Sequence, residues 1–208
     1  MKVLLVVLSG SQNRASFFQE QITKSGVLVN TGFDDPNAVI QPLEIDDKFS
    51  YKNPKTFSQS GGHYTGDWFS SRARSGLYLE GTTAFRGNIE ITNKPEFSSG
   101  AVPEIVSSLP QNLSYLEFVD NKGVIWFAEG IATGVKTQLQ KQSQQASLIP
   151  GKTSKIFGTA NLASLEKLRR VKNQFVAFAN GADSDLYYKT LDSIRWNQQD
   201  IVYVGGMQ

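Results

Sequence analysis

The feature that most constrains the fold is a predicted β-hairpin at residues 113–130. Two runs rich in β-branched and aromatic residues, LSYLEFV and VIWFAEG, flank the sequence Asp120-Asn121-Lys122-Gly123. Asp and Asn tolerate turn geometry, and Gly adopts a positive φ without steric cost. Both faces of the first run are largely apolar, so we expect a central strand pair that is covered on both sides. An antiparallel sheet would be built around this hairpin.

Hydrophobic periodicity predicts further strands and helices. The apolar run at residues 1–8 contains six consecutive apolar residues. This is too short for a secretory signal or a membrane span, so it predicts a buried first strand in a cytoplasmic protein. Alternation at residues 76–92, interrupted at 81–83, predicts a second antiparallel pair. Three-and-four spacing of apolar residues predicts a helix at 162–178, capped by Asn161. Further strands are expected at 27–30, 38–45 and 201–204, and helices or helical turns at 11–25, 102–108, 131–147 and 184–195.

Together these elements predict an α+β fold, with C-terminal helices packed on the sheet or projecting as an arm. The chain has 208 residues and a mass of 23.0 kDa, enough for one well-buried core or for a core with an extended arm. We expect a core domain at 1–147 and a linker containing Pro and Gly at 148–159. A helical segment that ends in a short strand is expected at 160–208.

Residues 46–75 show little periodicity and predict a long loop. Loops of this length are uncommon in compact domains unless they serve as binding segments or interface arms. Large aromatic residues recur within the loop. Because such residues are seldom left in water, the loop should lie against its own domain or against a neighbouring subunit. The candidate interface residues are Tyr51, Phe57, Tyr64, Trp68 and Phe69.

The composition excludes several kinds of active site. The chain has no cysteine and one histidine, which excludes disulfides, thiolate sites and multi-histidine metal sites. We therefore expect no metal and no cofactor. His63 is the sole ordinary general base near neutral pH, and a Ser-His-Asp arrangement could recruit Ser60 or Ser70, although no G-x-S-x-G sequence is present. The Gly151-Lys152-Thr153 sequence has Ala146 where a phosphate-binding loop requires glycine.

Charge is unevenly distributed, although the formal net charge is only +2. The first fifty residues hold six acids and four bases, whereas residues 131–175 hold eight bases and a single acid, Glu166. Opposite polarity in two segments suits head-to-tail packing between copies, but a basic stretch can also face nucleic acid or form an ordinary solvated helix face. The basic residues are Lys136, Lys141, Lys152, Lys155, Lys167, Arg169, Arg170 and Lys172.

The surface is rich in Ser, Thr, Asn and Gln, and a polar linker precedes the predicted helical tail. With the aromatic-rich loop, these features resemble a virion structural protein of a tailed bacteriophage, of the neck, tail-completion or capsid-decoration type. Tyr64-Thr65-Gly66, followed by Arg72, Arg74 and a strand at 89–93, is similar to a pattern in some neck proteins. The chain departs from that pattern because it lacks a long helix before the threonine-glycine pair, so no functional residue is carried over.

These observations predict a non-enzymatic structural subunit of a multi-copy assembly. The resemblance implies a virion component that is assembled in the host cytoplasm, without a membrane, as a homo-oligomer in contact with its own copies and other structural proteins. Two alternatives remain. One is a nucleic-acid-associated binding protein that uses the basic region 136–172. The other is a small hydrolase that uses His63.

Overall fold

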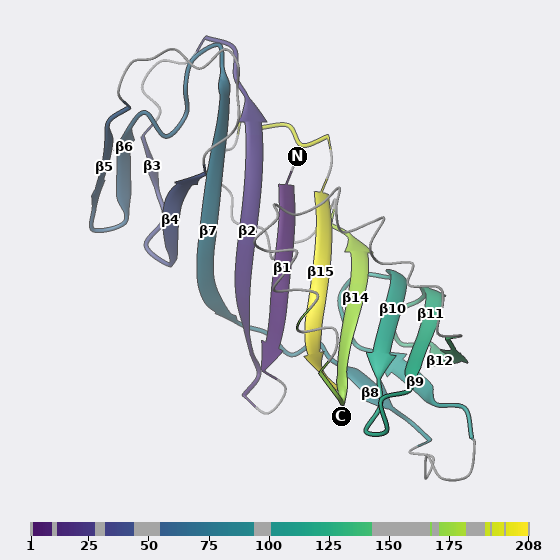
Figure 1. Ribbon diagram of the computed structural model, residues 1–208. Helices are drawn as coiled ribbons and strands as arrows, with labels where there is room; N and C mark the ends of the chain where they lie inside the picture. The colour runs from purple at the N-terminus through teal and green to yellow at the C-terminus, as the bar shows by residue number, and fades with distance from the viewer. Residues whose placement is uncertain are drawn as a thin grey trace.

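The computed structural model describes residues 2–9, 12–27, 32–43, 55–93, 101–142, 167, 171–181, 190–191, 193–197 and 199–207. These residues form one nine-stranded sheet and two three-stranded sheets (Figure 1). Lys167 is the single described residue in a helical conformation. The predicted α+β fold with C-terminal helices is therefore wrong for the described part of the chain, which is almost entirely β.

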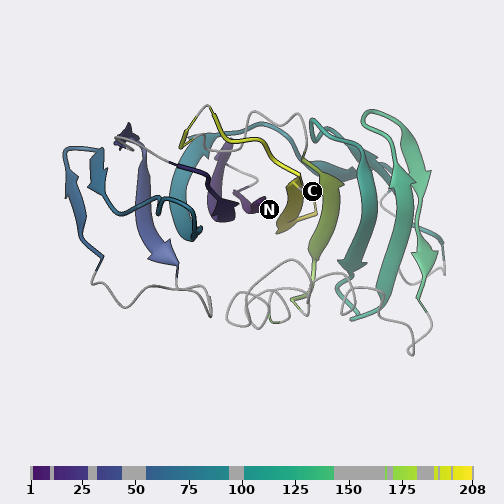
Figure 2. The same ribbon diagram turned by 90° about the horizontal axis from the view of Figure 1, so that it is seen from above.

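The nine-stranded sheet has the order β13-β11-β10-β14-β15-β1-β2-β7-β4, and one small sheet lies at each end of it (Figures 1 and 2). Its strands, in that order, are β13 (Gln140–Lys141), β11 (Ile125–Ile131), β10 (Leu113–Val119), β14 (Gln174–Asn180), β15 (Gln199–Gly206), β1 (Lys2–Ser9), β2 (Arg14–Lys24), β7 (Arg74–Ala84) and β4 (Ala38–Leu43). Near β4 lies the sheet of β3 (Phe33–Asp34), β6 (His63–Gly66) and β5 (Phe57–Ser60). Near β10 and β11 lies the sheet of β12 (Lys136–Gln138), β9 (Glu104–Ser107) and β8 (Ile89–Ile91).

The centre of the large sheet is a parallel pair formed by β1 and β15, in which Leu4 lies opposite Ile201 and Leu5 opposite Val202. On either side of this pair the described strands are antiparallel. The predicted first strand and the predicted strand at 201–204 are thus confirmed. Their pairing brings the two end regions of the chain side by side. Parallel neighbours require a long crossover connection, and here the other strands of the sheet lie in the chain between them.

Both faces of the central strands are buried. On one face, side chains of β1, β2, β7, β10, β14 and β15 form a large apolar cluster that includes Leu4, Phe17, Leu79 and Tyr203. On the other face, a smaller cluster contains Leu5, Tyr115, Val176, Phe178, Val202 and Val204. Burial of apolar surface on both faces is the main force that holds the two half-sheets together.

The predicted hairpin at 113–130 is confirmed as β10 and β11. Gly123 has a φ of +83° in the turn. The Asp120 carboxylate holds the turn, because its Oδ1 accepts the backbone N–H groups of Lys122 at 2.9 Å and Val124 at 2.8 Å. Its Oδ2 accepts the Trp126 indole N–H at 3.0 Å. β10 is covered on both sides as expected, whereas β11 is exposed at Glu129 and Gly130. The hairpin lies towards one end of the sheet rather than at its centre.

The predicted helix at 11–25 is instead β2, which pairs with β1 and β7. Two glutamines obscure the strand pattern because they face the large apolar cluster. Gln19 donates to Gln21 at 3.3 Å, and Gln21 donates to the Thr190 hydroxyl at 3.1 Å. Buried amides that are hydrogen-bonded in this way are tolerated in a core, but they disrupt the alternation from which a strand is predicted.

The predicted helix at 162–178 is also wrong over its described C-terminal part, because residues 174–180 form β14; Lys167 alone among its described residues is helical. Phe175 and Ala177 pack on one face of the sheet, and Val176 and Phe178 on the other. A strand that is buried on both faces reads as a continuous apolar run, which sequence alone does not distinguish from a helix. Strands also replace the helices predicted at 102–108 and 131–147, namely β9 and, as far as residue 142, β12 and β13. The described residues of 184–195 contain no helix.

The predicted strand pair at 76–92 has different partners. β7 runs without a break through Gly81 and pairs with β2 and β4, whereas β8 pairs with β9. Gly81 lies opposite Phe17, and a Cβ atom at Gly81 would stand 2.4 Å from the Phe17 ring. The glycine therefore makes room for a core aromatic ring and does not mark a turn, a known use of glycine inside strands.

Residues 46–75 are not an irregular loop throughout, because they include the β5–β6 hairpin and the start of β7. The predicted strand at 38–45 is confirmed over Ala38–Leu43. The predicted strand at 27–30 lies outside the described residues except for Val27, and the linker at 148–159 lies wholly outside them. The C-terminal segment contributes β14 and β15 to the same sheet as β1.

Candidate assembly interface

Three of the candidate interface aromatics are buried within the chain. Tyr64, Trp68 and Phe69 are 0%, 4% and 5% exposed. Phe33 stacks on Tyr64 at 4.9 Å between ring centroids, and Phe69 meets Phe33 edge-on at 5.7 Å. Aromatic pairs favour such arrangements. Of the two positions expected for the loop, against its own domain or against a neighbour, the first therefore applies to these three side chains.

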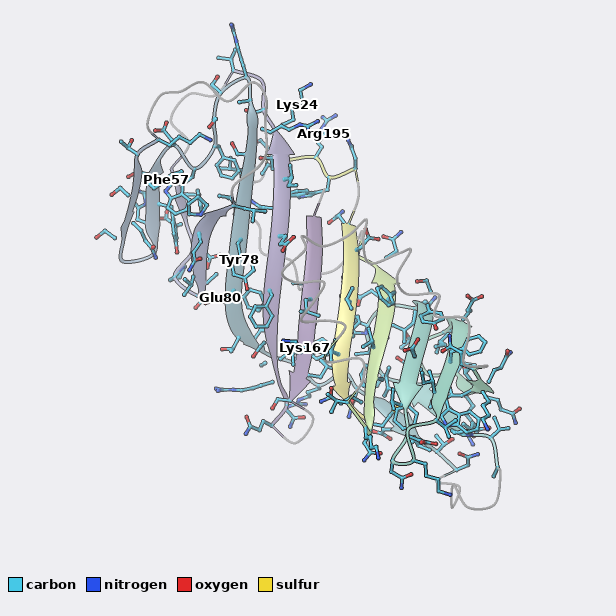
Figure 3. All side chains as sticks on the ribbon, viewed as in Figure 1. Lys24, Phe57, Tyr78, Glu80, Lys167 and Arg195 are labelled. Carbon is cyan, nitrogen blue, oxygen red and sulfur yellow. The ribbon has the colours of Figure 1, made fainter. Side chains whose placement is uncertain are left out.

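Phe57 is the candidate interface residue that remains accessible. It is 39% exposed and packs against the Trp68 ring at a centroid distance of 5.0 Å. Figure 3 places it on the three-stranded sheet at one end of the molecule. All four side chains of β5 are exposed. Tyr51 lies outside the described residues.

The edges of the described sheets differ in how they are protected against pairing with another chain. Exposed edge strands pair readily unless a charge or a proline blocks them. β5 has the sequence FSQS, with neither a charge nor a proline. Such a residue occurs in each of the other edge strands: Pro42 in β4, Lys141 in β13, Asp34 in β3, Lys136 in β12 and Glu90 in β8.

The β5–β6 hairpin determines which backbone groups of β5 face outwards. Its turn is Gly61-Gly62, with φ angles of +58° and +83°, as a two-residue turn of this type requires. The Asp67 N–H donates to the Thr56 carbonyl at 2.7 Å. Along an antiparallel ladder, opposite residues that exchange backbone hydrogen bonds alternate with opposite residues that do not. The register of the ladder therefore directs Ser58 and Ser60 towards β6 and leaves the backbone N–H and C=O of Gln59 directed outwards.

His63 lies in a row of three polar residues that crosses the small sheet. It is opposite Asp34 on β3 and opposite Ser60 on β5, and directly opposite residues share one face of a sheet. Its Nδ1 lies 2.5 Å from Asp34 Oδ1, with the two side chains 57% and 77% exposed. No described serine is hydrogen-bonded to His63. Ser70 does not lie in this row. It belongs to a different loop, where its carbonyl accepts the Ser25 hydroxyl.

The predicted basic surface is only partly described. Lys136 lies 3.1 Å from the Glu104 carboxylate. Hydrogen bonding from Thr92 and then from Lys136 lowers the pKa of Glu104, so Lys136 is neutralised locally. Lys141, Lys167 and Lys172 are exposed. The nucleic-acid alternative stays a prediction, because Lys152, Lys155, Arg169 and Arg170 lie outside the described residues.

A cleft that no sequence pattern predicts opens at the end of β2. It has a volume of about 600 Å³ and is lined by Lys24, Arg74 and Arg195, among others. These cations come from three distant parts of the chain, and no sequence pattern links them to one another. Only the folded structure brings them together, so no sequence signal could have found the cleft.

The described part of the chain holds no other feature that identifies a particular chemistry. Among the residues that the structure describes, no group of three or more His, Asp or Glu side chains is placed to hold a metal ion. Within the same residues, no helix has the length and apolar character needed to cross a membrane. No protein-family model matches the chain, and neither a curated protein nor a solved structure matches it.

Proposed function

We propose that the protein is a non-enzymatic structural subunit of a multi-copy assembly, in which the edge strand β5 pairs with an extended segment of a neighbouring copy. The observation that carries this proposal is the absence of any charge or proline in β5, in contrast to the other described edge strands. Strand addition at such an edge supplies main-chain hydrogen bonds. This role is the one expected of the virion component that the chain resembles.

Side-chain hydrogen bonds that hold β5 in its extended form favour the same function. The Gln59 amide donates to the Tyr64 hydroxyl at 3.0 Å, and that hydroxyl donates to the Ala38 carbonyl at 3.0 Å. The Trp68 indole N–H donates to the Ser58 carbonyl at 3.3 Å. An edge that is already held in its extended form loses little conformational entropy when a partner binds. Phe57 adds a half-exposed aromatic side chain beside that edge, as is typical of interface anchors.

Replacement of Gln59 by proline tests the pairing. Gln59→Pro removes the outward N–H and places a proline ring on the edge, so we expect the variant to remain a monomer where the wild type associates. Gln59→Ala is the matched control, because it also loses the bond to Tyr64 but keeps the outward N–H. It should associate like the wild type. Light scattering across protein concentrations measures the mass of each.

Two outcomes would contradict the proposal. The first is a wild-type protein that stays monomeric at every concentration tested. The second is a Gln59→Pro variant that associates as strongly as Gln59→Ala. Circular dichroism spectra and thermal unfolding of both variants would show whether the sheet itself remains intact.

One specific observation favours a second candidate function, a serine hydrolase. Asp34, His63 and Ser60 stand in the order of a catalytic triad across three neighbouring strands. The row is exposed, and His63 is not hydrogen-bonded to a described serine. A hydroxyl without a base partner is a weak nucleophile. This function therefore ranks below assembly.

Hydrolysis of an activated acetate ester separates the two functions. If the row is catalytic, Ser60→Ala and His63→Ala should each lower the rate by at least about 100-fold. Ser58→Ala, two residues along the same strand, should leave it unchanged. If the three variants match the wild type, the row is not catalytic and the assembly function stands alone.

A further inference from the structure

The cleft at the end of β2 concentrates positive charge. Lys24 ends β2, Arg74 begins β7, and Arg195 lies in the segment 193–197 that leads into β15. This segment, drawn in yellow, passes the end of β2 in Figure 1, and Figure 3 shows Lys24 and Arg195 near one another. No Asp or Glu belongs to the described lining of the cleft. Asp192, which precedes Ser193 of that lining, lies outside the described residues.

Two of the cations oppose each other directly. Lys24 and Arg74 are partners in the antiparallel ladder of β2 and β7, and like charges at directly opposite positions are destabilising. Among the described residues, no carboxylate forms an ion pair with Lys24, Arg74 or Arg195. An anion bound between them would attract both cations and so offset their mutual repulsion.

Hydrogen bonds hold the chain segments around the cleft in place. The Arg72 N–H donates to the Gly26 carbonyl at 2.7 Å, and the Ser25 N–H donates to the Ala73 carbonyl at 3.1 Å. The hydrogen bond from Gln21 to the Thr190 hydroxyl holds Thr190, which precedes the lining residue Leu191, against β2. Three separate stretches of chain are therefore fixed around one cleft, which favours a preformed binding site.

The lining also has an apolar part. Phe69, Leu191 and Ile194 contribute apolar side chains beside the hydroxyls of Ser25 and Ser193. A cleft of about 600 Å³ lies within the range of small-molecule sites. An apolar wall next to three cations suits a ligand with an anionic end and an apolar or aromatic body.

We propose that this cleft binds a phosphate monoester that carries an aromatic body. Charge decides between the common anions. A carboxylate supplies one negative charge, which would leave two of the three cations unpaired, whereas a phosphate monoester carries nearly two. Arginine pairs with phosphate through two parallel hydrogen bonds, and lysine binds it as a point charge. Both a free nucleotide and the 5′-phosphate of a nucleic-acid strand present this chemistry.

Calorimetric titration of the full chain at low salt tests the site with AMP, adenosine and inorganic phosphate. We expect AMP to bind about 10- to 100-fold more tightly than adenosine, because only AMP engages the cations. AMP should also bind more tightly than inorganic phosphate, because the apolar wall holds its base. Arg195→Ala should weaken AMP binding by a similar factor. Lys122→Ala, which removes an exposed cation from the β10–β11 turn, should not change it.

A second comparison identifies the source of the phosphate. A 5′-phosphorylated single strand that binds more tightly than AMP would assign the site to strand ends, and weaker binding would assign it to free nucleotides. Equal affinities for AMP and adenosine, or Arg195→Ala binding AMP as tightly as Lys122→Ala does, would overturn the proposal.

Thermal unfolding provides a readout that does not depend on a measurable affinity. Because Lys24→Gln removes the repulsion with Arg74, it should raise the Tm by about 1–4 °C in phosphate-free buffer of low ionic strength. It should also reduce the rise in Tm that AMP produces in the wild-type protein. A lowered Tm in phosphate-free buffer, or an undiminished rise with AMP, would contradict the proposed site.

Discussion

Phe118→Ala should lower the free energy of unfolding by about 3–5 kcal/mol. Phe118 is 1% exposed on β10. It lies between Trp126 on β11 and Phe175 on β14, which are its partners in the two ladders. Removal of its ring would leave a cavity between two rigid aromatic neighbours that cannot move together without shifting the strands. Such cavities carry the highest costs among substitutions of large by small residues.

The control for this prediction is Phe57→Ala, the same substitution on an edge strand. Phe57 is 39% exposed, so its loss should cost less than about 1 kcal/mol. Guanidinium unfolding of both variants, at concentrations where the protein is a monomer, measures the difference. Equal costs would mean that the β10–β14 region is not part of the cooperative core.

Val202→Asp should leave the chain largely unfolded at neutral pH, at a cost above about 4 kcal/mol. Val202 is 0% exposed on β15, opposite Leu5 of β1 and Phe178 of β14. A carboxylate at this position has no polar neighbour across either ladder. Burial would raise its folded-state pKa above the value in the unfolded chain. The destabilisation should therefore weaken as the pH falls towards 4 and the carboxyl group becomes neutral.

Val171→Asp provides the matched control, because Val171 is 43% exposed. It should change the free energy of unfolding by no more than about 0.5 kcal/mol at any pH between 4 and 8. Circular dichroism during denaturant titration at both ends of this range gives the comparison. A stably folded Val202→Asp variant at neutral pH would show that the β1–β15 pair is not the centre of the fold.

The amino-acid sequence by itself determined the elements whose signals lie in consecutive residues. The hairpin of β10 and β11 was predicted because Asp120 and Gly123 provide turn chemistry between two apolar runs. The end strands β1 and β15 were predicted from short apolar runs. Large aromatic side chains are seldom left in water, and Tyr64, Trp68 and Phe69 are buried.

Tertiary structure alone decided which strands pair and how charges converge. The sequences of β2 and β14 predict helices, because the buried glutamines of β2 and the apolar residues on both faces of β14 fit a strand only when neighbouring strands cover them. The edge character of β5, the row through His63 and the cleft of Lys24, Arg74 and Arg195 depend on register and on contacts between distant segments. Local propensity is a property of neighbouring residues, whereas pairing depends on burial that many distant residues share.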